Sequence, residues 1–196
     1  MQSMNATIAA QGAMFLLPDP VTCFRSASYA QKQIFHLSDN ASLLVLDWIT
    51  SGRSSMGEEW VFARYHSTND VWVDGERIAK DVMLLEEPGT NTPILPARSM
   101  GDRLAPYSCY ATVILWGPLV QSIIEKFTSE YDQISVFKAK IPSEIIWSLS
   151  PLTSKGGAIV RVAGKETETV KRWLGEALVM IQDIVGIDVY RNAFLS

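Results

Sequence analysis

Short apolar, β-branched runs separated by turn residues fill the first half of the chain, at the spacing of about 8–12 positions typical of all-β proteins. The longest run, Leu43–Ile49, has the length of a buried strand. After a polar break, Trp60 and Phe62 alternate with other residues and predict a second strand over Glu59–Tyr65. Asp74-Gly75 predicts a hairpin. Since no fixed-period repeat is present, we expect a mainly β fold of stacked or solenoid-like sheets.

The second half of the chain combines strand and helix patterns. Pro118 can open a helix, and apolar residues follow at helical spacing up to Phe127. A longer apolar stripe predicts a helix over Glu166–Val185, closed by Gly186. These are the two α-helices that we expect in the C-terminal half. The predicted strands of this half cover residues 107–116, 135–141, 145–149 and 158–163.

The segment 88–106 is rich in Pro, Gly, Asn and Thr and is predicted to be a long loop. It carries Arg98, Asp102 and Arg103. A contact with a partner and a solvated connection are both open interpretations of this loop.

Composition and charge limit the classes of protein. A chain of 196 residues with 47% hydrophobic residues forms one folded domain, residues 1–196. The net charge of −4 and the lack of a Lys/Arg cluster argue against nucleic acid as a partner. No apolar run reaches the roughly 20 residues that span a bilayer, so we expect no membrane insertion. Cys23 and Cys109 give no disulfide framework, although a bridge between them stays open, and we expect a cytoplasmic location.

Asp47 lies inside the apolar run Leu43–Ile49, where an unpaired carboxylate is unfavourable. Arg53 and Glu58 flank the turn that follows, and a guanidinium is the natural partner of a half-buried acid. We therefore expect a charged cluster of Asp47, Arg53 and Glu58 that holds a tight connection. The alternative to a functional role is an ion pair that only stabilises the fold.

The same stretch resembles the signature of the UreD/UreH family of urease accessory proteins. The similar positions are Asp47, Thr50, Gly52, Arg53, Gly57, Glu58, Trp60 and Phe62, preceded by the run from Gly12 to Pro20 and by Phe24-Arg25. The similarity covers nearly the whole chain and becomes looser after residue 100. It implies a eukaryotic-like member that lacks a further N-terminal segment of the family, with Tyr190-Arg191 near a short strand.

The resemblance implies a scaffold and not an enzyme. Family members bind UreF, UreG and apo-urease and help to bring nickel to the urease active site. The family motif in this chain would comprise Asp47, Gly52, Arg53, Gly57 and Glu58. A dimer formed through the accessory complex is left open.

Ligands for a tightly bound metal are scarce, because His36, His66 and the two cysteines form no close-spaced pair. We interpret each histidine as an ordinary strand residue. We expect no tightly bound cofactor and at most a transient contact with nickel, for which Asp47 and Glu58 are the candidates. The cluster either fixes a tight turn or lines a passage for the metal.

Enzyme signatures are missing: the chain has no Gly-x-Ser-x-Gly, no phosphate loop and no Gly-x-Gly-x-x-Gly. An acid–base pair of Asp47 and Glu58 in a glycan-binding or glycan-active β-protein is the alternative from another class. A generic β interaction domain with another partner is the third.

Overall fold

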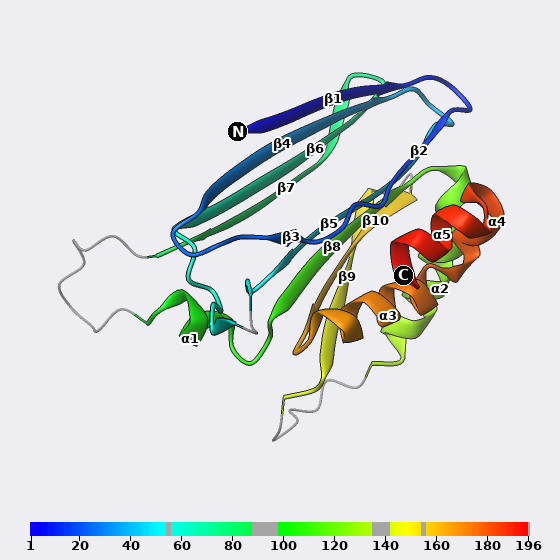
Figure 1. The fold of residues 1–196 in the computed structure, drawn as a ribbon. Coiled ribbons are helices and arrows are strands. Elements are labelled where there is room, and N and C mark those ends of the chain that lie inside the picture. Colours follow the sequence, from blue (N-terminus) through cyan, green and yellow to red (C-terminus); the bar gives the residue numbers. More distant parts are fainter. Residues whose placement is uncertain (54–55, 88–97, 135–141, 154–155, 196) are drawn as a thin grey trace.

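Three layers make up the molecule: two β-sheets face each other, and helices cover the second sheet (Figure 1). The computed structural model describes residues 1–53, 56–87, 98–134, 142–153 and 156–195. The mainly β prediction is confirmed. The solenoid-like arrangement is wrong, because the strands form two mixed sheets that pack face to face.

The first sheet, here called the outer sheet, has the strand order β1-β4-β6-β7. Three of its strands are parallel, and β7 returns antiparallel to β6 after the turn at Asp74-Gly75. Both turn residues have positive φ, +48° and +83°, so the predicted hairpin is confirmed. The strands are β1 (Gln2–Ile8), β4 (Ser28–Leu37), β6 (Arg64–Val73) and β7 (Glu76–Glu86).

The second sheet, here called the central sheet, has the order β2-β5-β8-β10-β9, with β3 beside β5. Every residue of β5 is buried, because one of its faces meets the outer sheet and the other meets the helices. This explains the unbroken apolar run. The strands are β2 (Ala13–Leu16), β3 (Val21–Thr22), β5 (Ser42–Thr50), β8 (Cys109–Trp116), β9 (Ile145–Thr153) and β10 (Gly156–Gly164).

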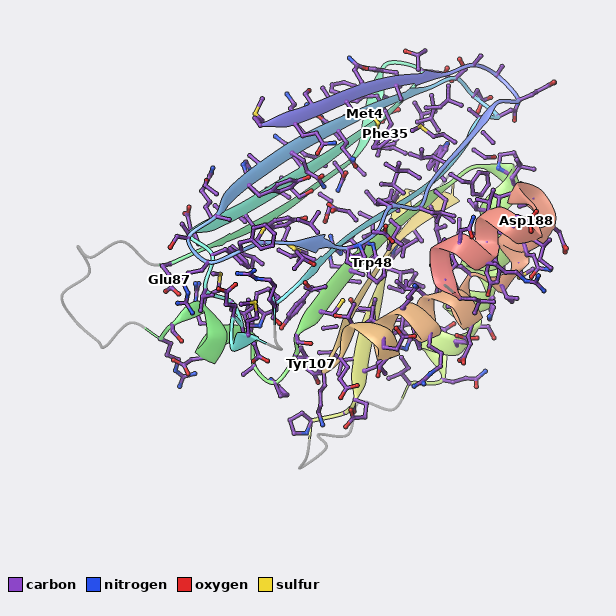
Figure 2. The ribbon with its side chains drawn as sticks, viewed as in Figure 1. Met4, Phe35, Trp48, Glu87, Tyr107 and Asp188 are labelled. Atoms are coloured by element: carbon purple, nitrogen blue, oxygen red, sulfur yellow. The ribbon has the colours of Figure 1, made fainter. Side chains whose placement is uncertain are left out.

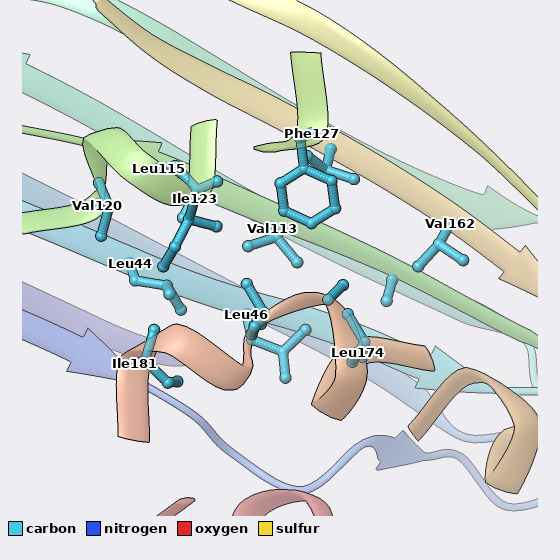
Figure 3. Packing of buried hydrophobic residues seen from close by; sticks show 14 of the residues in the cluster. Leu44, Leu46, Val113, Leu115, Val120, Ile123, Phe127, Val162, Leu174 and Ile181 are labelled. Atoms are coloured by element: carbon cyan, nitrogen blue, oxygen red, sulfur yellow. The ribbon is translucent and has the colours of Figure 1, made fainter. Parts of the chain in front are cut away.

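The helices bury their apolar faces against the central sheet. Figure 3 shows Leu44 and Leu46 of β5 among side chains from the helices, including Phe127 and Leu174. On the other face of the central sheet, two further apolar clusters fill the space toward the outer sheet. The helices are α1 (Met100–Leu104), α2 (Gln121–Asp132), α3 (Thr167–Ala177), α4 (Gln182–Val185) and α5 (Ile187–Phe194), with 3₁₀ turns at Pro118–Val120 and Val179–Ile181.

The C-terminal helices differ from the prediction. The single helix expected over 166–185 is α3, a 3₁₀ turn and α4, so the described residues after 100 hold more than two helices. Tyr190 and Arg191 lie in α5, so the short strand implied there is wrong. The reason is packing: the Tyr190 hydroxyl donates to the Gly175 carbonyl at 2.8 Å, and Phe194 lies where Gly175 has no side chain.

The strand predicted over 59–65 begins only at Arg64. Trp60 has a φ of +55°, outside strand geometry, yet Trp60 and Phe62 are buried as their alternation indicated. Within the predicted loop 88–106, α1 forms a short helix with a capping box between Ser99 and Asp102. Residues 88–97 of the predicted loop and the predicted strand 135–141 lie outside the described residues.

Candidate functional site: a polar seam between the sheets

Asp47 extends from the middle of β5 toward the outer sheet and accepts four hydrogen bonds there. Gln31 Nε2 and the Tyr65 hydroxyl donate to Oδ1 at 2.9 and 3.1 Å. Ser67 Oγ and Asn69 Nδ2 donate to Oδ2, the latter at 2.7 Å. All the donors belong to β4 and β6, so this one carboxylate fastens the central sheet to two strands of the outer sheet.

The donors around Asp47 are all neutral, and no ion pair to Asp47 is found in the described part of the chain. Its side chain is 7% exposed, so its charge is stabilised by hydrogen bonds in place of a cation. Burial, and then the charge of Asp47, raises the pKa of Tyr65, which therefore remains a proton donor at neutral pH. The site is a buried negative charge without a counter-ion.

Asp47 belongs to a row of polar residues that crosses the central sheet, and a second row crosses the outer sheet opposite it. Strand register aligns each row from one strand to the next. We call the two rows together the polar seam. Its members are Asp47, Thr112 and Arg161 on β5, β8 and β10, and Gln33, Asn69 and Asp81 on β4, β6 and β7.

Two contacts join the rows across the gap: Asn69 donates to Asp47, and the Arg161 guanidinium pairs with Asp81. The seam separates the two apolar clusters that lie between the sheets, one around Phe35 and Leu43 and the other around Tyr65. The seam is therefore a polar layer between two apolar clusters.

A cavity lies at each end of the seam. The first, of about 230 Å³, is lined by Gln33 and Asp47 beside β1 and β2. The second, of about 290 Å³, is lined by Thr112 and Arg161 beside β7 and β9. The seam thus runs from a cavity at one edge of the sandwich to a cavity at the other.

Three oxygen atoms along the seam are buried and have no hydrogen-bond partner among the described residues. They are Gln33 Oε1, Asn69 Oδ1 and Thr112 Oγ1. Buried acceptors are nearly always satisfied, because desolvation without a partner is unfavourable. Gln33 lines the first cavity, Thr112 lines the second, and Asn69 belongs to the seam that joins them, so the seam can interact with water or a cation that enters from either edge.

The other predicted site residues form a separate cluster after β5. Arg53 pairs with Glu58 through Nε at 2.9 Å and Nη2 at 2.8 Å, and Arg25 Nε lies 3.7 Å from the same carboxylate. The Arg53 hydrogen bond holds the pKa of Glu58 below its usual range. The expectation that Arg53 pairs with Asp47 is wrong, since Asp47 is satisfied by the outer sheet. Asp47 and Glu58 therefore share no acid–base site.

The glycines of the predicted motif give the Arg53–Glu58 loop its shape. Gly52 has a φ of +128°, and a Cβ there would lie 2.4 Å from the Glu58 carbonyl oxygen. Gly57 has a φ of +67° but open space around it. Gly52 is thus required by close approach of the backbone and Gly57 by its conformation alone.

The histidines and cysteines contribute no site. His36 and His66 lie on the face of the outer sheet that turns away from the seam, and Cys23 and Cys109 are buried, free and in different clusters. The described residues hold no group of three or more His, Cys, Asp or Glu side chains able to bind a metal. Among the helices described, none has the length and apolar character that crossing a membrane requires.

Sequence reasoning missed most of the seam. One signal was available: Ser67, Thr68, Asn69 and Asp70 are four consecutive polar residues shortly before the predicted hairpin turn, and the structure buries all four in β6. A polar run that is buried in a strand indicates partners on both faces. No local pattern marks Gln31, Thr112 or Arg161.

Comparison with known proteins connects this architecture to one family. A family model described as UreD urease accessory protein matches residues 1–191. Urease accessory protein 4 of Cryptococcus neoformans var. grubii is 34% identical over 192 residues, 90% of this chain and 57% of the relative. Urease accessory protein D of Arabidopsis thaliana is 33% identical, with 94% of this chain and 67% of the relative covered.

A bacterial relative, urease accessory protein UreD of Anaeromyxobacter sp., is 32% identical and covers 96% of this chain and 60% of its own length. The chain therefore spans about three fifths to two thirds of the length of these curated relatives. The matched region includes the seam and the Arg53–Glu58 loop together. The chain belongs to the UreD family of urease accessory proteins.

Proposed function

We propose that this chain acts in the cytoplasm as a non-catalytic scaffold that supports nickel insertion into apo-urease, in a complex with UreF and UreG. Membership of an accessory-protein family supports the expectation that it is not an enzyme. The separation of Asp47 from Glu58 removes the carboxylate pair on which the glycan-active alternative depended.

Nickel is the cargo in this proposal, and the polar seam is its path between the sheets. The seam offers oxygen and amide groups without thiolates or imidazoles, which favours weak contacts that a divalent ion can leave again. Within the seam Asp47 is the charged residue without an ion-pair partner among the described residues, and it lines the first cavity together with Asp19 and Lys32. Its negative charge attracts a cation to that end of the seam. At the second cavity the positive charge of Arg161 is balanced by Asp81.

The observation that carries the proposal is the set of unpartnered oxygens between the two cavities. An apolar filling would serve stability at least as well as an unsatisfied polar one. Groups kept polar without a partner therefore indicate a use beyond folding.

Thr112→Val tests the path without breaking a hydrogen bond, because Thr112 Oγ1 has no partner among the described residues and valine has the same shape. We expect unchanged or higher thermal stability and a rate of nickel-dependent urease activation about two- to tenfold lower, as for the loss of one polar contact. The assay mixes purified apo-urease, the complex of this chain with UreF and UreG, Ni²⁺ and GTP, and follows nickel content and activity.

Thr68→Val is the matched control, since Thr68 is buried on β6 but points away from the seam. Asp47→Asn removes the charge in the same assay and should lower nickel transfer while pull-down shows an intact complex. Wild-type transfer rates in both Thr112→Val and Asp47→Asn would exclude the seam as the path. If the wild-type chain forms no complex with UreF and UreG in the pull-down, the scaffold role itself is contradicted.

A further inference from the structure

The ion pair between Arg161 and Asp81 at the second cavity joins a movable partner to a fixed one. The Asp81 side chain on β7 is 9% exposed, whereas the Arg161 side chain on β10 is 45% exposed. Arg161 also lines the cavity of about 290 Å³, so its guanidinium has free volume beside it into which it can move. The carboxylate is therefore held in place while the guanidinium can leave it.

Asp81 differs from Asp47, the other carboxylate of the seam, in the number of its partners. Asp47 accepts hydrogen bonds from four side chains on two strands. Among the described residues, Asp81 has one side-chain partner, the Arg161 guanidinium. A cation that binds Asp47 directly must displace donors anchored on the outer sheet, but at Asp81 it needs to displace only one side chain. Asp81 is therefore the better direct ligand for an ion in the seam.

Two of the unpartnered oxygens of the seam belong to neighbours of this ion pair. Asn69 is the register partner of Asp81 in the outer sheet, and Thr112 is the register partner of Arg161 in the central sheet. Register partners in antiparallel strands have Cα atoms about 4.5–5.5 Å apart and side chains on the same face. Figure 2 shows side chains from both sheets meeting in the space between them. Asn69 Oδ1 and Thr112 Oγ1 therefore lie in the same part of the seam as the ion pair.

The Arg161 guanidinium satisfies neither of these oxygens, although it carries five N–H donors. Those donors lie in one plane, and Asp81 accepts from one of them. A metal ion binds ligands from several directions, and carboxylate, amide carbonyl and hydroxyl oxygens suit divalent cations. The oxygens of Asp81, Asn69 and Thr112 thus match a divalent cation better than they match the arginine.

We propose that Asp81, Asn69 and Thr112 form a divalent-cation site at the second cavity, and that the Arg161 guanidinium is its built-in counter-ion until an arriving ion displaces it. The guanidinium keeps its proton in proteins, so it can leave only by moving, and its charge repels a second cation while it stays. The site opens by exchange of one cation for another, and the buried Asp81 is never left unpaired.

This inference rests on the proposed function in taking nickel as the ion that travels along the seam. The site itself requires neither UreF, UreG nor urease, so it can be tested on the purified chain with Ni²⁺ alone. Isothermal titration calorimetry gives the dissociation constant.

Arg161→Gln removes the competing charge and should lower the dissociation constant for Ni²⁺ about tenfold or more. Arg161→Lys keeps the charge and should bind Ni²⁺ as wild type does. Asp81→Asn added to Arg161→Gln should abolish the gain in affinity, because the charged ligand is then lost.

The Arg77–Asp70 ion pair provides a matched control. It too joins a half-exposed arginine, 46% exposed, to a buried aspartate, 8% exposed. Asp70 follows Asn69 on β6 and so faces away from the seam, whereas the three unpartnered oxygens belong to the seam. Arg77→Gln should therefore leave the affinity for Ni²⁺ unchanged. An equal gain in Arg77→Gln and Arg161→Gln would mean that any released carboxylate binds Ni²⁺, and would overturn the proposal.

A second measurement uses the wild-type chain, so it does not depend on whether Arg161→Gln folds. Phenylglyoxal modifies accessible guanidinium groups, and peptide mass spectrometry gives the rate of modification at each arginine. Saturating Ni²⁺ should raise the rate at Arg161 about twofold, because a side chain that is 45% exposed moves into the open and loses its ion pair. The rate at Arg77 should not change.

A folded Arg161→Gln chain that binds Ni²⁺ no more tightly than wild type overturns the proposal. So does a rate of modification at Arg161 that Ni²⁺ leaves unchanged. Neither result bears on the scaffold role, because neither measurement involves apo-urease. A gain of affinity in Arg161→Gln together with wild-type transfer rates in Asp47→Asn and Thr112→Val would instead exclude the path and leave the cation site established.

Discussion

Gly52 and Asp47 are close in sequence, but backbone conformation constrains the first and hydrogen bonding constrains the second. Gly52 is constrained by the backbone, since its φ is positive and the Glu58 carbonyl occupies the place of a side chain. Asp47 is constrained by its four neutral donors, which a smaller or an apolar side chain would leave without an acceptor. Two residues five positions apart thus combine a conformational requirement with an electrostatic one.

Gly52→Ala should lower the free energy of unfolding by about 2–4 kcal/mol, because alanine adds both an unfavourable φ and a steric overlap. Gly57→Ala is the control, with positive φ but open space, and should lower it by about 1 kcal/mol. Urea unfolding of both variants measures the difference. Equal losses would mean that the overlap at Gly52 is relieved by movement of the loop.

The Arg53–Glu58 pair should make stability depend on acid pH. The folded-state pKa of Glu58 is lowered, so the pair stabilises the protein above the ordinary glutamate pKa of about 4.3, and this stabilisation is lost as pH falls through the folded value. Glu58→Gln should be less stable than wild type at pH 7, and the difference in stability should be smaller near pH 3. Thermal unfolding at both pH values measures this, and a constant difference would contradict the assignment.

At the scale of elements, local pattern predicts those whose environment is uniform. Strand β8 matches its prediction because both of its faces are buried, and α2 follows the predicted helical spacing because one apolar stripe packs into one core cluster. The segment 59–63 and α5 do not. Trp60 is buried through a left-handed turn, where its Nε1 donates to the Tyr107 carbonyl at 3.2 Å, and the position of α5 depends on a carbonyl 15 residues earlier. Periodicity carries no information on such distant partners.

Phe194→Ala tests whether α5 is an integral part of the fold. Phe194 is 2% exposed and packs in the core between the helices and the central sheet, so its truncation should lower the free energy of unfolding by about 3–5 kcal/mol. Leu195→Ala, at a residue 66% exposed, should change it by less than about 0.5 kcal/mol. Chemical denaturation gives both values. If both substitutions changed the free energy of unfolding by similarly small amounts, α5 would not be held by packing against the core.

At the scale of the molecule, the mainly β class follows from the spacing of apolar runs, but the layering does not. The hydrogen bonds that build the seam join residues 16 to 22 positions apart around Asp47, and 80 positions apart between Asp81 and Arg161. Which strand faces which is set by these contacts. The sequence could therefore indicate Asp47 as unusual without identifying its partners.

The two aligned rows also determine how the sheets are placed against each other. If only apolar side chains met between the sheets, one sheet could shift against the other at a small cost in packing energy, because apolar side chains of similar volume can replace one another. A carboxylate that needs four donors has a single position that satisfies it, so a displacement of either sheet by one pair of residues would break all four bonds together. A fully apolar seam would still hold the two sheets together but would lose this fixed alignment of one sheet on the other.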